Sequence, residues 1–275
     1  MVFLPVLPLA SVGLSLSARH GMFAAVIACA VIALLADAGY ILFFALFIIL
    51  PLTHFVRKCL LCRGDGVAKQ WYPALSALSE MTLLSAGVFM VFALTSVHAE
   101  HIELKTIVAA ALSDTSNSPM EDADPNISHY IRLLANQWSF LVFAAASWIW
   151  VLLIYAFVVL ANTLLVSRHV ALRPSLAFTP LGLPMWLPVI LLLSAALAFL
   201  GKGNDSFAGK TVFLIMLLPY FLSGIASMHR LTLAWAGRKF WLISFYFLLV
   251  FFPWVAVLVI ARGVYTQLEG MLEHN

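Results

Sequence analysis

The sequence has few charged residues. Asp, Glu, Lys and Arg make up 10% of its 275 residues, whereas an average soluble domain contains about a quarter. Hydrophobic residues make up 64% of the chain, and the mean hydropathy is +1.04. A soluble core of this length cannot bury so much apolar surface. The composition therefore excludes an ordinary soluble domain and predicts that a lipid bilayer surrounds most of the chain.

The apolar runs lack the alternation of apolar and polar residues that is typical of strands in a membrane barrel. Runs such as Ile41 to Pro51 and Leu187 to Leu200 are unbroken. Backbone groups inside lipid must pair within the chain, and α-helices satisfy this requirement. We therefore predict an all-α fold, a polytopic transmembrane bundle of about eight helices in one membrane domain that spans residues 1–275.

Cysteine and the common catalytic motifs are scarce or absent. The three cysteines, Cys29, Cys59 and Cys62, are too few for a disulfide framework. Cys59 and Cys62 form a C-x-x-C, but a structural zinc site needs four ligands and no second pair exists. The sequence also lacks a Walker loop, a nucleotide-binding glycine fingerprint, an H-E-x-x-H and a nucleophile elbow. We expect no catalytic residues, no metal, no cofactor and no nucleic-acid partner, and hence no enzyme.

Apolar runs bounded by charged residues predict the membrane spans. The amino terminus lacks the basic residues that open a signal peptide, so its apolar segment is expected to be a retained first span. The eight predicted spans cover residues 3–17, 21–36, 40–55, 71–97, 138–166, 185–200, 211–228 and 240–261. Pro219 and Pro253 lie inside the last two spans, where each predicts a kink.

Lysine and arginine are distributed unevenly over the predicted loops. If the loop after the third span is cytoplasmic, ten of the fifteen Lys and Arg residues lie inside and five outside, with Arg262 among the outer ones. Nearly all acidic residues then lie outside. This asymmetry supports the predicted number of spans, because one missed helix would exchange the inner and outer sides for all later loops and mix the charges. Both termini are predicted to face outward.

The largest predicted piece outside the bilayer is the extracytoplasmic segment 98–137. Apolar residues between Ile102 and Leu112 recur near helical spacing, which predicts a short helix on the membrane surface. Residues 113–125 are acidic and rich in turn formers, which is typical of a mobile loop.

Glu80 is the sharpest anomaly, because it lies about nine residues and roughly 13 Å inside the fourth span. A carboxylate there costs at least about 2.5 kcal/mol unless it is paired, protonated or wetted. Ser76 lies on the same helix face, and Asn162, at similar depth in the fifth span, is a candidate partner. Tyr155 and Tyr220 are candidate pocket residues. The set indicates a ligand, cation or proton site; otherwise a protonated Glu80 only joins two helices and the tyrosines only pack.

Small residues recur every fourth position along the second span. Gly21, Ala25, Cys29 and Ala33 form one stripe, and such stripes let helices approach closely. The stripe predicts either packing within this chain or docking of another membrane subunit.

The carboxy-terminal half carries an ordered set of short motifs. They are Arg173-Pro174, Leu183-Pro184-Met185-Trp186-Leu187, Gly203-Asn204, Pro219-Tyr220-Phe221-Leu222-Ser223-Gly224-Ile225-Ala226, Phe245-Tyr246-Phe247 and Phe251-Phe252-Pro253. Through them nearly the whole chain resembles the YybS-like bacterial predicted membrane proteins, a family of unknown function. That family is distantly similar to the substrate-binding subunits of energy-coupling-factor transporters.

The resemblance implies a multi-pass protein of the bacterial cytoplasmic (inner) membrane that binds a small solute or assists its transport. It also implies a partner, a coupling membrane protein with separate ATPases, that docks on the stripe of the second span, and a pocket in the outward half of the bundle. The alternative is a non-catalytic scaffold or assembly factor of the cell envelope that uses the segment 98–137.

Overall fold

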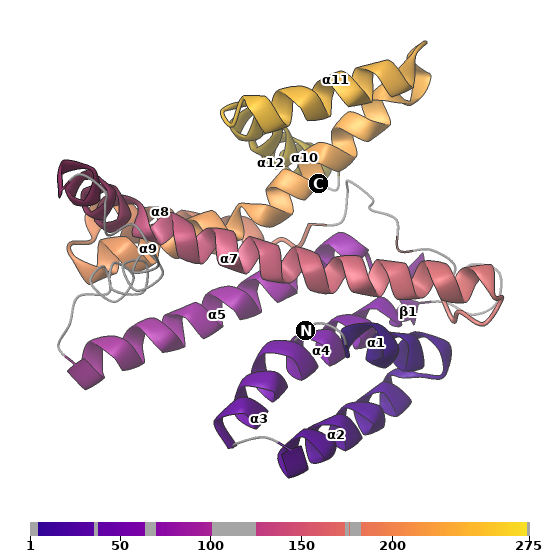
Figure 1. The fold of residues 1–275 in the computed structure, drawn as a ribbon. Helices are drawn as coiled ribbons and strands as arrows, with labels where there is room; N and C mark the ends of the chain where they lie inside the picture. The colour runs from indigo at the N-terminus through magenta and orange to yellow at the C-terminus, as the bar shows by residue number, and fades with distance from the viewer. Residues whose placement is uncertain are drawn as a thin grey trace. The chain divides into compact units, whose positions relative to one another are not determined.

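The chain is helical throughout most of its described length (Figure 1). The computed structural model describes residues 5–35, 38–63, 70–100, 125–173, 176 and 183–273. Its helices are α1 (Val6–Ser15), α2 (Ala18–Leu35), α3 (Ala38–Phe44), the π-helix η1 (Ala45–Ile49), α4 (Leu50–Cys59), α5 (Ala74–Glu100), α7 (Pro125–Ser167), α8 (Leu187–Leu200), α9 (Asn204–Met216), α10 (Leu218–Leu231), the 3₁₀-helix η3 (Thr232–Ala234), α11 (Arg238–Phe251) and α12 (Val255–Glu273).

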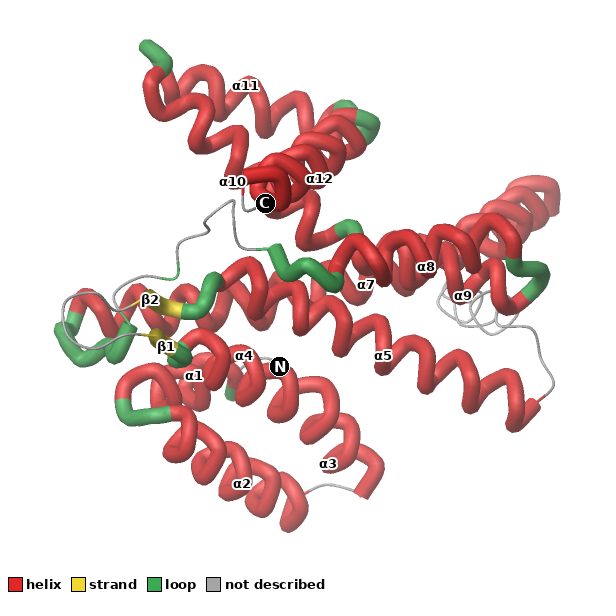
Figure 2. The backbone as a smooth tube through the Cα atoms, turned by 180° about the vertical axis from the view of Figure 1, so that it is seen from behind, coloured by secondary structure: helices red, strands yellow, loops and turns green. Residues whose placement is uncertain are grey.

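A short antiparallel hairpin is an addition to the predicted all-α fold. Strands β1 (Cys62–Arg63) and β2 (Gln70–Trp71) pair with Cys62 opposite Trp71, and Figure 2 shows them side by side. The hairpin is only two residues long on each side, so the fold class remains all-α as predicted.

Five helical segments in the described part of the chain are long and apolar enough to cross a membrane. They are Tyr40–Cys59, Ala74–Val91, Phe140–Ser167, Asn204–Ala234 and Val255–Leu272. Three more apolar helices are shorter, namely Val6–Ser15, Ala18–Leu34 and Leu187–Leu200. At about 1.5 Å per residue these reach about 15 to 25 Å, less than the hydrocarbon thickness of about 30 Å. The protein therefore has several candidate membrane spans, and the predicted number of eight stays a prediction.

Contacts within the chain form two compact units that share two long helices. The first unit comprises Met1–Met81, Trp150–Pro184 and Pro219–Asn275, and the second comprises Thr82–Ile149 and Met185–Leu218. One part of α5 belongs to the first unit and the other part to the second, and the same is true of α7. The prediction of a single membrane domain is not tested by this division.

In the first unit, α1, α2 and α4 pack closely through small residues. A Cβ atom on Gly13 of α1 would lie 2.7 Å from Val56 Cγ1 of α4, and one on Gly21 of α2 would lie 3.0 Å from Gly13 Cα. The glycines therefore let the first two helices meet backbone to backbone. Leu172, which follows α7, donates its N–H to the Leu14 carbonyl at 3.1 Å and ties this group to the end of α7.

Pro51 shapes the run from α3 to α4. A proline has no N–H, so the Phe47 carbonyl four residues earlier loses its ordinary helical donor, and the preceding turn is the π-helix η1. The indole Nε1 of Trp150 on α7 donates to that Phe47 carbonyl at 2.9 Å. A side chain of a neighbouring helix thus satisfies the backbone group that the proline leaves open.

The helices α5 and α7 are longer than the predicted spans. α5 runs from Ala74 to Glu100, and α7 begins at Pro125, well before the predicted start at residue 138. Proline suits the first position of a helix because its missing N–H has no intrahelical partner there. Residues 101–124, which hold the predicted surface helix and nearly all of the acidic loop, lie outside the described residues.

In the second unit, α8 and α9 form a tight pair with α9 folded back on α8 (Figure 2). Gly209 permits this contact, because a Cβ there would lie 2.4 Å from the Ala198 backbone nitrogen. Ser206 donates to the Ala198 carbonyl at 2.8 Å. Rings of Phe89, Phe143 and Phe207 meet with centroids 5.0 to 6.4 Å apart and join α5, α7 and α9.

The predicted seventh span, residues 211–228, covers parts of two helices within the helical segment Asn204–Ala234. The helix α9 ends at Met216, and α10 begins at Leu218, just before Pro219. At this break the Leu214 carbonyl accepts the N–H of Leu217 in a tighter turn and the indole N–H of Trp148 at 2.9 Å.

In the first unit, α10 and α12 cross at a pair of glycines. A Cβ on Gly224 of α10 would lie 2.0 Å from the Val259 carbonyl oxygen, and a Cβ on Gly263 of α12 would lie 2.0 Å from the Tyr220 carbonyl oxygen. Each helix therefore places a glycine against the backbone of the other, and no larger residue fits without moving the helices apart.

The predicted eighth span, residues 240–261, is wrong in its position. The helix α11 ends at Phe251, Phe252 adopts φ −124° and ψ 87°, and α12 begins at Val255. The residue before a proline is pushed out of the helical region by the proline ring, so Pro253 breaks the helix instead of bending it. The span-length segment here is Val255–Leu272, and it contains Arg262, which the sequence placed outside the membrane.

Candidate functional site

Glu80 lies in a cluster of four ionisable side chains in the first unit. Its Oε1 accepts a hydrogen bond from the Lys58 ammonium at 2.9 Å and one from the Tyr72 hydroxyl at 2.7 Å. His54 Nε2 lies 2.8 Å from Oε2. The carboxylate therefore joins α5 to the last turns of α4 and to the segment that precedes α5, and both oxygens are engaged.

The local sequence explains how the two bases meet the acid. His54 and Lys58 are four residues apart on α4, so they lie on one face of that helix. α5 begins at Ala74, which places Glu80 about 9 Å into the helix instead of the predicted 13 Å. At that depth the long Lys58 side chain can reach Glu80 from the end of α4. The acid of this candidate span is thus met by bases close to a helix boundary.

The cluster is partly accessible. The exposed fractions of the side chains are 18% for Glu80, 37% for His54 and 29% for Lys58. An ion pair that keeps this access is weaker than a fully desolvated one, because water screens it.

Tyr72 joins the acid to its serine neighbour. Its hydroxyl donates to Glu80, its ring lies 5.3 Å from the Lys58 ammonium, and it is hydrogen-bonded to Ser76. Ser76 is buried on the first turn of α5. Ser76 and Glu80, which were predicted to share one helix face, are therefore connected by Tyr72, which is hydrogen-bonded to both. Burial raises the pKa of Tyr72 to about 12, and the hydrogen bond to the Glu80 carboxylate and the charge of that carboxylate contribute to the increase.

Ultraviolet titration should detect this raised pKa. The phenolate absorbance of the wild type minus that of Tyr72→Phe is expected to rise with a midpoint near pH 12, whereas an unperturbed tyrosine titrates near pH 10. Because the folded state favours the neutral phenol, the contribution of Tyr72 to stability is complete below about pH 10 and is lost as the pH rises through about 12. A difference midpoint near pH 10 would contradict the burial of Tyr72 together with its hydrogen bond to Glu80.

Arg173 caps the end of α4 beside the cluster. Its Nη1 donates to the Cys59 carbonyl at 2.8 Å and to the Tyr72 carbonyl at 3.0 Å, and its guanidinium lies 5.7 Å from the Trp71 ring. A cation at a helix C-terminus is favourable because it meets the negative end of the helix dipole. Arg173 thus holds α4, the hairpin and the start of α5 together. Cys59 itself is a buried free thiol, and Cys62 is exposed on β1.

The other predicted ligand-binding residues lie apart from Glu80. The Asn162 side chain is buried on α7, and its Oδ1 has no hydrogen-bond partner among the described residues. Asn162 is therefore not the partner of Glu80; His54, Lys58 and Tyr72 are. Tyr155 donates to the Leu176 carbonyl at 3.3 Å and packs against Phe55.

Tyr220 belongs to a different contact. Its side chain is 1% exposed, and its carbonyl lies at the crossing of α10 with α12 beside Gly263. The predicted pocket set therefore separates into the Glu80–Ser76 cluster and three residues that lie elsewhere in the first unit.

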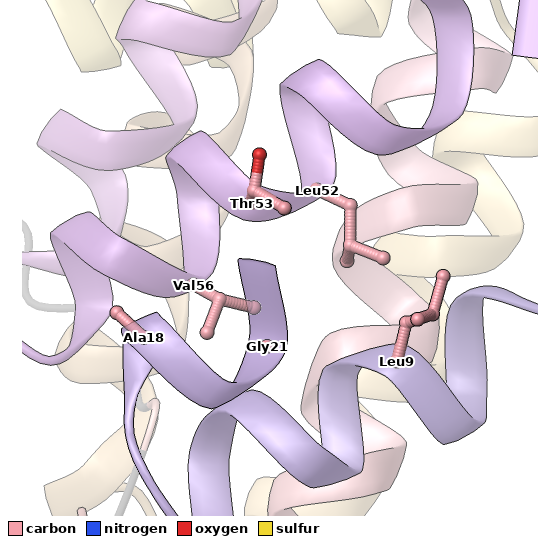
Figure 3. A pocket seen from close by; sticks show the side chains of 6 residues that line it. All are labelled: Leu9, Ala18, Gly21, Leu52, Thr53 and Val56. Atoms are coloured by element: carbon pink, nitrogen blue, oxygen red, sulfur yellow. The ribbon is translucent and has the colours of Figure 1, made fainter. Parts of the chain in front are cut away.

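The small-residue stripe of α2 is divided between the interior and the surface. Gly21 and Ala25 are buried, Cys29 is half-buried and Ala33 is exposed. Gly21 also lines a small cleft between α1, α2 and α4 (Figure 3). The cleft is bordered by Leu9, Ala18, Gly21, Leu52, Thr53 and Val56. Its volume of about 10 Å³ is at the lower limit for one water molecule, so it holds no larger ligand.

Sequence reasoning identified Glu80 but missed the residues that surround it. Neither His54 nor Lys58 was among the predicted site residues. The i, i+4 spacing of His54 and Lys58 was the available signal, since it places two bases on one helix face. Nothing local indicates that this face meets α5.

No family model, no curated protein and no solved structure matches this chain. The chemistry of the cluster is therefore the basis for a functional assignment. The Glu80 carboxylate, with hydrogen-bond donors from three side chains around it, can bind a proton, exchange one of these donors for a cationic group of a ligand, or hold two helices together.

Proposed function

We propose that this protein is a non-catalytic, small-solute-binding or transport-associated subunit of the bacterial inner membrane, with about eight spans. The observation that carries the proposal is the Glu80 carboxylate, which lies within a candidate membrane span and is shared by Lys58, His54 and Tyr72. Intramembrane carboxylates commonly mark solute or ion pathways. The partial exposure of the cluster supports entry of a solute.

The proposed binding step is an exchange of partners at Glu80. A solute with a cationic group takes the place of Lys58 or His54 on the carboxylate, and the released base is free to meet an anionic group of the same solute. Tyr72 stays on Oε1 and keeps the carboxylate oriented. A zwitterionic solute suits this arrangement best, because acid and bases are then both satisfied.

The proposed partner is a coupling membrane protein with separate ATPases. It docks on the exposed end of the α2 stripe, at Cys29 and Ala33, because Gly21 and Ala25 are already used inside the chain. This arrangement is what the resemblance of the carboxy-terminal motifs implies.

Affinity purification from the native membrane in a mild detergent, followed by mass spectrometry, tests the proposal. We expect recovery of an ATPase pair and a coupling membrane protein. Ala33→Leu should lose these partners, and the matched control Val26→Leu, at another exposed position of α2, should keep them. Recovery of envelope-assembly proteins without an ATPase would overturn the transport role and favour the alternative, a membrane scaffold.

A further inference from the structure

Arg262 is a charged side chain in the middle of a span. The candidate span Val255–Leu272 places it about 10 Å from one end and about 15 Å from the other. The side chain is half-buried. Arginine stays charged at every physiological pH, so an arginine at this depth needs partners for its charge and its donors.

The described part of the chain gives this guanidinium two contacts. Its Nε donates to the Ser227 hydroxyl of α10 at 3.0 Å, and its face lies 5.1 Å from the Tyr265 ring. Within the described residues, neither Nη nitrogen has a hydrogen bond and no carboxylate lies within salt-bridge distance. The nearby acid on α12, Glu269, is hydrogen-bonded to Tyr265 instead. Among the described residues, the paired donors of the guanidinium fork therefore have no acceptor.

Buried polar side chains lie on the two helices that meet at Arg262. Ser223 and Ser227 are buried on α10, and Thr266 and Gln267 are buried on α12. The glycine crossing of Gly224 and Gly263 brings these two faces together. Ser227 lies about one turn before the end of α10 at Leu231.

We propose that Arg262, with Ser227 holding its Nε, is a binding site for an oxyanion, a phosphate or a carboxylate group. A guanidinium fork matches two oxygens of such a group in a planar, bidentate pair. The oxyanion belongs either to a phospholipid headgroup or to a free anionic solute. This site uses none of the side chains of the Glu80 cluster, so it stands whether or not Glu80 binds a solute.

Thermal unfolding of the full chain in nanodiscs tests the site, with tryptophan fluorescence as the readout. The three samples are phosphatidylcholine alone, phosphatidylcholine with phosphatidylglycerol, and phosphatidylcholine with added inorganic phosphate. We expect a rise of several degrees in the melting temperature in at least one of the last two samples. A rise with phosphatidylglycerol alone assigns a lipid headgroup, and a rise with inorganic phosphate assigns a free anion.

The variants decide whether Arg262 causes the rise. Arg262→Gln should abolish it and weaken the apparent affinity for the anion at least about tenfold. The exposed Arg168→Gln, which removes the same charge, should leave it intact. Arg262→Lys keeps the charge without the fork and should lose at least half of the rise, which decides the matter if Arg262→Gln does not fold. A rise that is unchanged in Arg262→Lys, or no rise in the wild type, overturns the proposal.

Discussion

Gly224→Ala is expected to be the most damaging single substitution among the glycines of α10 and α12. Its new Cβ would lie 2.0 Å from the Val259 carbonyl oxygen, and backbone cannot move aside as a flexible side chain can. Overpacking of this kind costs about 3 kcal/mol, which corresponds to a fall of roughly 6 to 12 °C in the melting temperature for a chain of this size. Thermal unfolding in mild detergent, followed by tryptophan fluorescence, measures it.

Gly87→Ala is the matched control for this prediction. Gly87 lies within α5, and nothing is within 4 Å of the position that a Cβ would take. Alanine is the better helix former by up to about 1 kcal/mol, so this variant should unfold at the same or a higher temperature. Gly263→Ala should resemble Gly224→Ala, and the double variant should lose less than the two single losses combined, because both act on one crossing. Equal melting temperatures for Gly224→Ala and Gly87→Ala would mean that the crossing is absent.

Glu80→Ala is expected to cost about 2 kcal/mol. Removing one partner of a buried ion pair costs about 3 to 5 kcal/mol because the other charge is left uncompensated, and the partial exposure of Lys58 and His54 lowers this figure. Lys58 and His54 would lose their shared acceptor, and Tyr72 would lose its carboxylate. The loss should appear as a lower midpoint in thermal or denaturant unfolding of the purified protein.

A double-mutant cycle separates the ion pair from the other losses. Glu80→Gln and Lys58→Met, singly and together, should give an interaction free energy of about 1 kcal/mol, since the side chains touch at 2.9 Å. Asp205→Asn, at an exposed acid in the first turn of α9, is the control and should change stability by less than about 0.5 kcal/mol. Additive effects of Glu80→Gln and Lys58→Met would show that the two side chains do not interact.

The sequence located the unusual acid but not its surroundings. Glu80 is conspicuous because a carboxylate is rare among apolar residues. A single unusual residue of this kind can be recognised from the sequence without knowledge of its neighbours in space. Its bases are 22 and 26 positions away, and only the packing of α4 against α5 brings them within hydrogen-bonding distance. Asn162 was proposed as a partner from depth alone, and depth along a span does not say which side of a helix faces which neighbour.

The prolines show the same limit in helix boundaries. Pro219 and Pro253 were correctly recognised as positions where a helix is disturbed, and the structure has a break at each. Whether a proline bends a helix or ends it depends on the surroundings of the helix, such as a donor for the carbonyl that the proline leaves open. At Pro51 the indole N–H of Trp150 is that donor for the Phe47 carbonyl, and it comes from α7, far away in the chain. Pro253 was predicted to bend the last span, whereas the helix ends at Phe251, so that span and Arg262 were misplaced.

The amino-acid sequence by itself determined the helical class, the apolar character that suits a bilayer, and the presence of an acid inside a candidate span. These follow from composition and from local runs, because transfer into lipid acts on each segment separately. The tertiary structure decided that Glu80 meets His54, Lys58 and Tyr72, and that Arg262 faces Ser227 on α10. These contacts depend on where the helices cross. Glycines such as Gly13, Gly224 and Gly263 permit the crossings, because a side chain at those positions would clash with the neighbouring helix, and that neighbour is known only from the tertiary structure.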